Sequence, residues 1–580
     1  MPTDPENPTR QAGKPEARGV GSWLVPGSLL ALFLISGASF LATQRTRDAG
    51  RYAAPPGREP SRGGVFRFPI YASPVQTLDP ARAETGSDIM LVQQIYDGLT
   101  AFDEHLNIVP ALARYWEISP DGKTYTFELR SDAHFHNGRP VNAEDCVYSL
   151  QRLLAPGHNE NNYHYFSRIE GAEDFRAGRA SQVRGLRALD EKTFQIRFTT
   201  PFVPALSVLG MYCAKILPKK EVEAEGEGFF DAPVGTGPFR FSHWIGPDED
   251  AAAPSYRGIL QAVHLEANRD YFGGPPYLDG LTFRAVWNRR GAKPEKPVNE
   301  LVDCLPGMAE NYGDWVPVET EKLLAVNYLI LPIKVPPYDD PRVRRALNYA
   351  LDKRSFLDSN PRTAGIPAAT GIVPPGIPGF VPMESSYQHN LEKARSLLVE
   401  AGYPGGKGLP PLEIAVLEKG RYGSDPYAAA RRGCLIYCMS QIGVEVDLIK
   451  VTRMVRPHDP SFQDRPMIFQ GLTWFADFPD PDNFLRPLFH SSSPINSTGY
   501  QNPKVDRLLD RALSVTSYSA RNKLYRKIEK LILADSPIIP LDYDRIRFML
   551  RPNVRGFSLS SMGDPYIKMN KVWLDRPTDF

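Results

Sequence analysis

The sequence predicts an α/β protein with more than one domain. The chain has 580 residues, and because a single hydrophobic core stops growing near about 250–300 residues, at least two cores are expected. In the second half, segments with the periodicity of strands alternate with segments with the periodicity of helices. This alternation is typical of an α/β layer architecture.

The N-terminal segment differs in character from the rest of the chain. Residues 1–21 are polar and rich in Pro, and we expect them to be disordered. Residues 22–42 form an uncharged apolar run, about as long as a helix that spans a bilayer. We interpret residues 22–42 as a transmembrane anchor or a signal segment, with the anchor favoured, and residues 43–63, rich in Arg, Gly and Pro, as a linker.

The first half of the folded part is expected to contain strands, turns and a few helices. Residues 64–71 alternate as in a strand, and residues 89–99 carry apolar side chains at helical spacing. Residues 116–130 predict a hairpin, and Asn142 is expected to cap a helix.

The glycine-rich segment GTGPF at residues 235–239 predicts a structural turn before a strand. A phosphate-binding loop is disfavoured because the segment lacks the GxxxxGK[ST] pattern and Pro238 has no amide N–H.

The second half contains the clearest alternation of helices and strands. Asp340 is expected to cap a helix whose first residue is Pro341. The expected strands are 327–335, 412–416, 444–451, 538–542 and 548–550, and the expected helices begin at Pro341 and cover 391–401, 427–442, 503–515 and 521–533.

Composition and motifs exclude several classes of function. The 68 Lys and Arg residues balance the 67 Asp and Glu residues, so no basic face for nucleic acid is expected. No GxSxG, HExxH or Walker pattern supports an enzyme, and no cofactor is expected. Cys434 and Cys438 are four residues apart, which predicts two buried thiols on one helical face in preference to a metal site or disulfide.

Two weak metal-site patterns are present, and neither is favoured. His134 and His136 would share a face of a strand. The segment DFPDPDN at 477–483 resembles a calcium loop only in part, because Asn483 breaks its alternation and no Gly follows. Asp480 and Asp482 are instead interpreted as turn carboxylates, one of which caps a helix beginning near Asn483.

Several segments, taken in order, resemble the family 5 extracytoplasmic solute-binding proteins of ABC importers, which include oligopeptide- and dipeptide-binding proteins. The resemblance covers the chain from about residue 64 to its end. The segments are LDPARA (78–83), IYDGL (95–99), PALARYWEISPDGKTYTFELR (110–130), FHNGRPVNAEDCVYSLQRL (135–153), GTGPFRF (235–241), PYLDGLTFR (276–284), DDPRVRRALNYALDK (339–353) and WFADFPDPDNFL (474–485).

The resemblance implies a two-lobe, periplasmic-binding-protein-like clamp of type II with an extra domain inserted in the first lobe. Lobe 1 would comprise residues 64–99, 218–327 and 541–580, the inserted domain 100–217, and the ligand-binding lobe 2 residues 328–540. The chain would cross between lobes near residues 327 and 540, and closure about such a hinge buries a small solute.

The resemblance also implies a ligand site in the segment around Trp474. Asp477 would receive the α-amino group of a peptide, the backbone around Thr473 and Phe475 would pair with the peptide main chain, and Trp474 would supply an apolar wall. Relatives often carry an Arg three residues before the Trp for the peptide carboxylate, whereas this chain has Gly471 there.

The implied function is that of a periplasmic substrate-binding component, anchored by the N-terminal helix, that serves the permease subunits of an ABC transporter. Its ligand would be a short peptide or a similar small solute. An anchored solute sensor, or a binder of another solute such as a nickel complex, remains the alternative.

Overall fold

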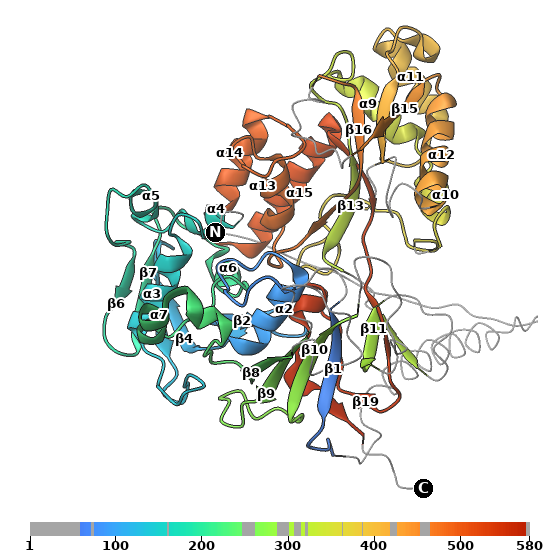
Figure 1. Ribbon diagram of the computed structural model, residues 1–580. Helices are drawn as coiled ribbons and strands as arrows, with labels where there is room; N and C mark the ends of the chain where they lie inside the picture. The colour runs from blue at the N-terminus through green and yellow to red at the C-terminus, as the bar shows by residue number, and fades with distance from the viewer. Residues whose placement is uncertain are drawn as a thin grey trace, which may run out of the picture. The chain divides into compact units, whose positions relative to one another are not determined.

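The folded part of the chain is built from several β-sheets with helices packed against them (Figure 1). The computed structural model describes residues 59–70, 75–158, 162–245, 262–286, 301–306, 315–319, 323–361, 363–384, 387–417, 426–452 and 464–575. The predictions for residues 1–21 and 22–42, and most of that for 43–63, lie outside the described residues. None of the helices in the described ranges combines the length and the apolar character that a bilayer crossing requires.

A four-stranded sheet joins the start of the folded chain to residues about 200 positions later, in the order β1-β10-β9-β8. Strand β1 (Val65–Ile70) is parallel to β10 (Gly280–Ala285), and it confirms the strand predicted from residues 64–71. Strands β9 (Ala262–Ala267) and β8 (Phe239–Ile245) continue the sheet in antiparallel fashion. A three-stranded sheet of β11 (Cys304–Pro306), β18 (Arg547–Leu550) and β12 (Val316–Glu319) contains a strand from near the C-terminus.

The glycine turn before β8 is structural, as predicted. A Cβ atom added to Gly235 would lie 1.9 Å from the backbone oxygen of Ile95, and one added to Gly237 would lie 2.4 Å from that of Gln94. Glycine is therefore required because this turn packs directly on the end of helix α2 (Gly86–Ile95).

A second four-stranded sheet, β4-β5-β7-β6, lies within the region predicted to be an inserted domain. Strands β4 (Ala113–Ile118) and β5 (Thr124–Leu129) form the predicted hairpin. The sheet is completed by β7 (Thr193–Arg197) and β6 (Leu186–Ala188). Helix α3 (Ala143–Leu153) begins as expected, because the Asn142 side chain accepts the backbone N–H of Asp145 at 3.0 Å.

The third large sheet has five strands in the order β15-β14-β16-β13-β17. Their bounds are β15 (Val446–Val451), β14 (Leu412–Leu417), β16 (Met467–Phe475), β13 (Ala325–Ile330) and β17 (Ile538–Asp542). Strand β16 is parallel to β14 over a short stretch and antiparallel to β13. The predicted strand 327–335 ends at Ile330, because Pro332, Pro336 and Pro337 follow and have no amide N–H for a sheet ladder.

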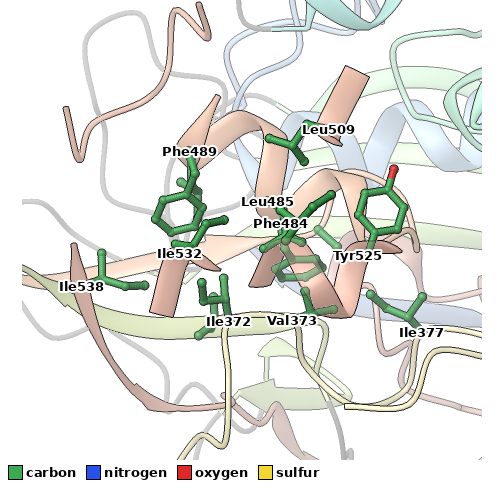
Figure 2. Close-up of a cluster of buried hydrophobic side chains, with 14 of the residues drawn as sticks. Ile372, Val373, Ile377, Phe484, Leu485, Phe489, Leu509, Tyr525, Ile532 and Ile538 are labelled. Carbon is green, nitrogen blue, oxygen red and sulfur yellow. The ribbon is translucent and has the colours of Figure 1, made fainter. Parts of the chain in front are cut away.

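Strand β13 separates two hydrophobic cores. Tyr328 and Ile330 belong to a core that includes Phe484, whereas Leu329 and Leu331 belong to another core. Successive side chains of a strand point to opposite faces, so the two cores lie on opposite sides of the sheet. Figure 2 shows the first core, where side chains of helices α13 (Asp482–Phe489), α14 (Pro503–Ala512) and α15 (Tyr518–Asp535) meet residues 372–377 and β17.

The second core is covered by the helices predicted between residues 341 and 442. Asp340 caps α9 (Pro341–Ala350) as expected, with its carboxylate accepting the N–H of Arg342 at 2.7 Å. Helices α11 (Leu391–Glu400) and α12 (Pro426–Ser440) match the predicted ranges within two residues, as α14 and α15 do within three. The helix expected at 89–99 instead occupies Gly86–Ile95, because Thr85 and Asp88 form a capping box that starts it earlier.

The remaining elements are short. They are β2 (Thr100–Phe102), β3 (Ile108–Pro110), α4 (Tyr163–Phe166), α5 (Ala172–Arg176), α6 (Ala205–Leu209), α7 (Lys219–Glu225), η1 (Gly226–Asp231), α10 (Lys353–Asp358), η2 (Pro404–Gly406), β19 (Val554–Arg555), η4 (Asp564–Tyr566), η5 (Met569–Lys571) and β20 (Trp573–Leu574).

Candidate ligand-binding site

Strand β16 carries the residues Thr473, Trp474 and Phe475, and one of its edges is open. On one side, β16 pairs with β13 along most of its length, up to Phe475 opposite Ala325. On the other side, the described ladder with β14 ends at Ile468 opposite Ile414. Residues 469–475 therefore have no strand partner on that side among the residues that the structure describes.

The backbone groups of Thr473 and Phe475 face this open edge. Immediately after β16, the N–H of Ala476 donates to the backbone oxygen of Leu324 at 2.9 Å, which continues the ladder with β13. In an antiparallel ladder, the residues that bond to the neighbouring strand alternate with residues whose N–H and C=O point the other way. Ala476 and Trp474 thus point toward β13, and Thr473 and Phe475 point away from it.

Asp477 lies where three distant parts of the chain meet. Its Oδ2 accepts a hydrogen bond from Oη of Tyr165 in α4 at 3.0 Å. Its backbone oxygen accepts one from Oη of Tyr566 at the end of η4, at 3.3 Å. Asn483 in the first turn of α13 donates from Nδ2 to the same Oδ2 at 3.2 Å.

The carboxylate of Asp477 has no cationic partner among the described residues. Burial raises its pKa, and the hydrogen bonds from Asn483 and Tyr165 oppose that rise. The side chain is half-buried, and both donors are neutral, so they replace only part of the interaction with a positive charge that such a carboxylate favours. The site is therefore suited to a guest that brings a positive group.

The side chains of the predicted site residues lie on two faces of β16. Trp474 packs against the core that contains Phe484, and its indole Nε1 is buried without a hydrogen-bond partner in the described structure. Phe475 is on the other face and is 52% exposed.

Thr473 lies on the same face of β16 as Phe475 and begins a row of polar side chains across the sheet. Its hydroxyl donates to Oδ1 of Asn327 in β13, and Nδ2 of Asn327 donates to Asp542 in β17 at 2.8 Å. Arg431 of α12 is close enough to lower the pKa of Asp542, which burial raises. The row thus runs from β16 across β13 to β17, away from the open edge of β16.

Sequence reasoning missed Asn483, Tyr165 and Tyr566. A tyrosine about 310 residues away from Asp477 leaves no mark in local sequence patterns. For Asn483 a signal was present, because an Asn near the start of a helix commonly bonds to backbone N–H groups. Its Oδ1 accepts the N–H of Asp477 at 2.8 Å.

The interpretation of Asp480 and Asp482 as turn carboxylates is confirmed only in part: Asp480 accepts a backbone N–H at the start of α13, but both side chains are also buried in ion pairs. Asp480 is buried and makes a two-bond ion pair with Arg521, at 2.7 and 2.9 Å, and Asp482 is buried against Arg486 at 3.0 Å. The cap position of α13 is Pro481 and has no side-chain cap, although Asp480 accepts the N–H of Asp482 at 2.8 Å. Since both carboxylates are paired with Arg, they are unsuited to calcium.

The histidine pair (His134 and His136) and the cysteine pair (Cys434 and Cys438) have the surroundings of residues with a structural role. His136 accepts the N–H of Gly235 at 3.2 Å, and its Nε2 lies 3.0 Å from the backbone oxygen of Gly237, while His134 is exposed. Burial lowers the pKa of His136 to about 4. Cys438 is buried and Cys434 half-buried, and in the described residues no group of three or more His, Cys, Asp or Glu side chains is placed to hold a metal ion.

Comparison with known proteins agrees with this fold. Heme-binding protein A of Haemophilus influenzae is 30% identical over 496 residues, which cover 81% of this chain and 85% of that protein. Probable di/tripeptide-binding protein 5 of Pseudomonas aeruginosa is 27% identical over 86% of this chain and 97% of its own length. The solved structure of HbpA2 from Haemophilus parasuis superposes with a TM-score of 0.66 at 25% identity, over 88% of this chain and all of that one.

The solved relatives share the type II periplasmic-binding-protein fold, and this chain has that α/β, two-lobe fold. Residues 107–496 match the family described as "Bacterial extracellular solute-binding proteins, family 5 Middle". This match covers more than half of the 580 residues. The chain therefore belongs to the family 5 bacterial extracellular solute-binding proteins, and it is a solute-binding component of ABC transport.

Proposed function

We propose that this protein binds a short peptide, or a similar solute with a free amino group, through Asp477. The observation that supports this is a half-buried carboxylate that, among the described residues, has no cationic partner and receives side-chain hydrogen bonds from neutral donors. The α-ammonium group of a peptide would supply the missing charge and form a short, strong, charge-assisted hydrogen bond. Heme, which the name of one relative mentions, has no ammonium group, so the site favours a peptide.

The open edge of β16 supports the same ligand class. A peptide in extended conformation can bond to the outward-facing N–H and C=O groups of Thr473 and Phe475 as an added strand. These backbone contacts do not depend on the ligand's side chains. The exposed ring of Phe475 and the indole of Trp474 would contact apolar parts of the ligand.

Asp477→Asn is expected to weaken binding of a dipeptide by more than about 1.5 kcal/mol, the lower range for a hydrogen bond to a charged group. The physical reason is that a neutral amide cannot neutralise the ligand ammonium. Isothermal titration calorimetry with a dipeptide identified by native mass spectrometry checks this. Asp447→Asn, at an exposed position of β15, is the matched control and should bind as the unaltered protein does. Equal affinity of the Asp477→Asn protein would remove the role proposed for Asp477.

The domain boundaries and the location of the protein belong to the same proposal. Lobe 1 would comprise residues 64–99, 218–327 and 541–580, the inserted domain 100–217, and lobe 2 residues 328–540. The lobes would close over the ligand and present it to the permease subunits of an ABC importer, without an enzymatic step. Residues 22–42 would hold the protein at the outer face of the membrane or direct its export.

A further inference from the structure

Asn483 is the residue whose side chain meets both Asp477 and Tyr165. It is the second residue of α13, and 0% of it is exposed. Its Oδ1 accepts the N–H of Asp477 at 2.8 Å. Its Nδ2 donates to Oη of Tyr165 at 2.7 Å and to Oδ2 of Asp477 at 3.2 Å.

These contacts set the direction of every hydrogen bond in the group. Because Oδ1 of Asn483 accepts a backbone N–H, the amide orientation is determined and Nδ2 must face Tyr165 and Asp477. Oη of Tyr165 receives one of the Nδ2 hydrogens, so its own hydrogen is directed to Oδ2 of Asp477, 3.0 Å away.

The two oxygens of Asp477 therefore have different roles. Oδ2 accepts from both Tyr165 and Asn483. Oδ1 accepts no hydrogen bond in the described structure, and it is not among the buried polar atoms that lack a partner, so it keeps some accessible surface. The carboxylate presents one saturated oxygen and one that is available to a ligand.

We propose that Asn483 is the positioning residue of the ligand-amine site: it holds Oδ2 of Asp477 against Tyr165 and leaves Oδ1 for the ammonium group. This rests on the proposed role of Asp477 and deepens it by assigning the residue that prepares the carboxylate. The amide also ties Tyr165 of α4 to α13, so the contact between these two parts of the chain and the orientation of the carboxylate depend on one side chain.

The same geometry determines how readily Asp477 is protonated. Hydrogen bonds that stabilise the ionised form lower the pKa of a carboxyl group, and that of Asn483 opposes the effect of burial. Tyr165, Tyr212, Cys213 and Tyr566 lie near Asp477, and each has a pKa raised by burial. His164, whose ring centroid is 3.8 Å from that of Tyr165, and Asp482, which acts on Tyr165, are also close, so the titration must be followed at a signal assigned to Asp477 itself.

The test follows the carboxyl carbon of Asp477 by NMR in the ligand-free, 13C-aspartate-labelled protein, with Asp477→Asn used to assign the signal. Asn483→Asp is isosteric and places a second carboxylate beside the first, so it should raise the midpoint of the Asp477 titration by at least about one pH unit. Asn483→Leu removes the donor without adding charge and should raise the midpoint by a smaller amount. Affinity for a dipeptide at neutral pH should fall at least about tenfold in both variants.

Asn496→Asp is the matched control, because Asn496 is also buried and uses its Nδ2 for two backbone oxygens, those of His490 and Tyr500. Replacing a residue that has only a structural role would lower the melting temperature without moving the midpoint of the Asp477 titration, and this is the result expected for the control. An unchanged midpoint in both Asn483 variants would overturn the proposal. Because the titration uses no ligand, it still tests Asn483 if peptide binding proves independent of Asp477, and that second result would count only against the proposed function.

Discussion

Arg521→Met is expected to lower the free energy of unfolding by about 3–5 kcal/mol, the usual cost of removing one partner of a buried ion pair. Arg521 is 2% exposed and donates two hydrogen bonds to Asp480, at 2.7 and 2.9 Å. Its Nε donates to the backbone oxygen of Ala512 at 3.0 Å, so it joins α15 to the end of α14. Methionine would fill much of the volume but leave the carboxylate of Asp480 buried and unpaired.

Chemical denaturation at neutral pH measures this loss, and two comparisons locate its cause. The double variant Arg521→Met, Asp480→Leu should recover a large part of the lost stability, because replacing both members of a buried pair by apolar residues is often close to neutral. Arg179→Met removes an ion pair with Asp174 in which both side chains are largely exposed, and it should change stability little. A loss of less than about 1 kcal/mol in the single variant would show that water reaches Asp480.

The ion-pair network also holds the turn that follows Asp477. Tyr525 receives a hydrogen bond from Arg521 at 2.9 Å and donates to Asp482 at 2.9 Å, and Asp482 pairs with Arg486. These contacts fix the start of α13 and therefore the place of Asn483. We infer that the network keeps the carboxylate site ordered before a ligand arrives, which lowers the ordering cost of binding.

The local elements of this fold could be predicted because their signals lie within a few residues. Asn142 and Asp340 cap helices where an Asx residue precedes an amphipathic run, and the hairpin of β4 and β5 turns at Pro120-Asp121-Gly122. The motif around Trp474 placed Asp477 at the candidate site through a resemblance to known proteins. Boundaries failed where a neighbour acts from outside the periodic run, as with the capping box of Thr85 and Asp88.

Contacts between distant parts of the chain could not be predicted, because nothing in local periodicity records them. The pairing of β1 with β10, and of Tyr165 with Asp477, joins residues separated by more than 200 positions. The richness in Pro and Asp predicts turn residues at Asp480 and Asp482. Asp480 meets Arg521 only when the start of α13 packs on α15, whereas Asp482 and Arg486 are four residues apart in α13, a spacing that the sequence does record.

Glu529 of α15 carries a carboxyl group that is buried in an apolar core. Its burial leads us to expect a large dependence of stability on pH. It is 0% exposed, and its Oε1 accepts the N–H groups of Ile372 at 2.6 Å and Val373 at 3.0 Å, while its Oε2 is buried without a hydrogen-bond partner in the described structure. Figure 2 shows the apolar side chains of Ile372, Val373 and Ile532 in this core. Two titratable groups lie nearby. The charge of Arg526 lowers the pKa of Glu529, and Glu529 in turn raises the pKa of Tyr543.

Burial raises the pKa of Glu529 from 4.5 to about 7, so the folded protein should lose stability as the pH rises between these values. Below pH 4.5 the group is protonated in both states, between 4.5 and 7 only the unfolded chain releases the proton, and above 7 both states are ionised. At about 1.4 kcal/mol per pH unit, the loss across this window is roughly 3 kcal/mol.

In Glu529→Gln the amide oxygen can still accept the two N–H groups but cannot ionise. The stability of the unaltered protein relative to this variant should therefore fall by that amount between pH 4.5 and 7 in denaturation curves, whereas Glu445→Gln at an exposed position should show no such trend. A constant difference between the protein and the Glu529→Gln variant would mean that Glu529 is ionised in the folded core, and that the two N–H donors alone outweigh its burial.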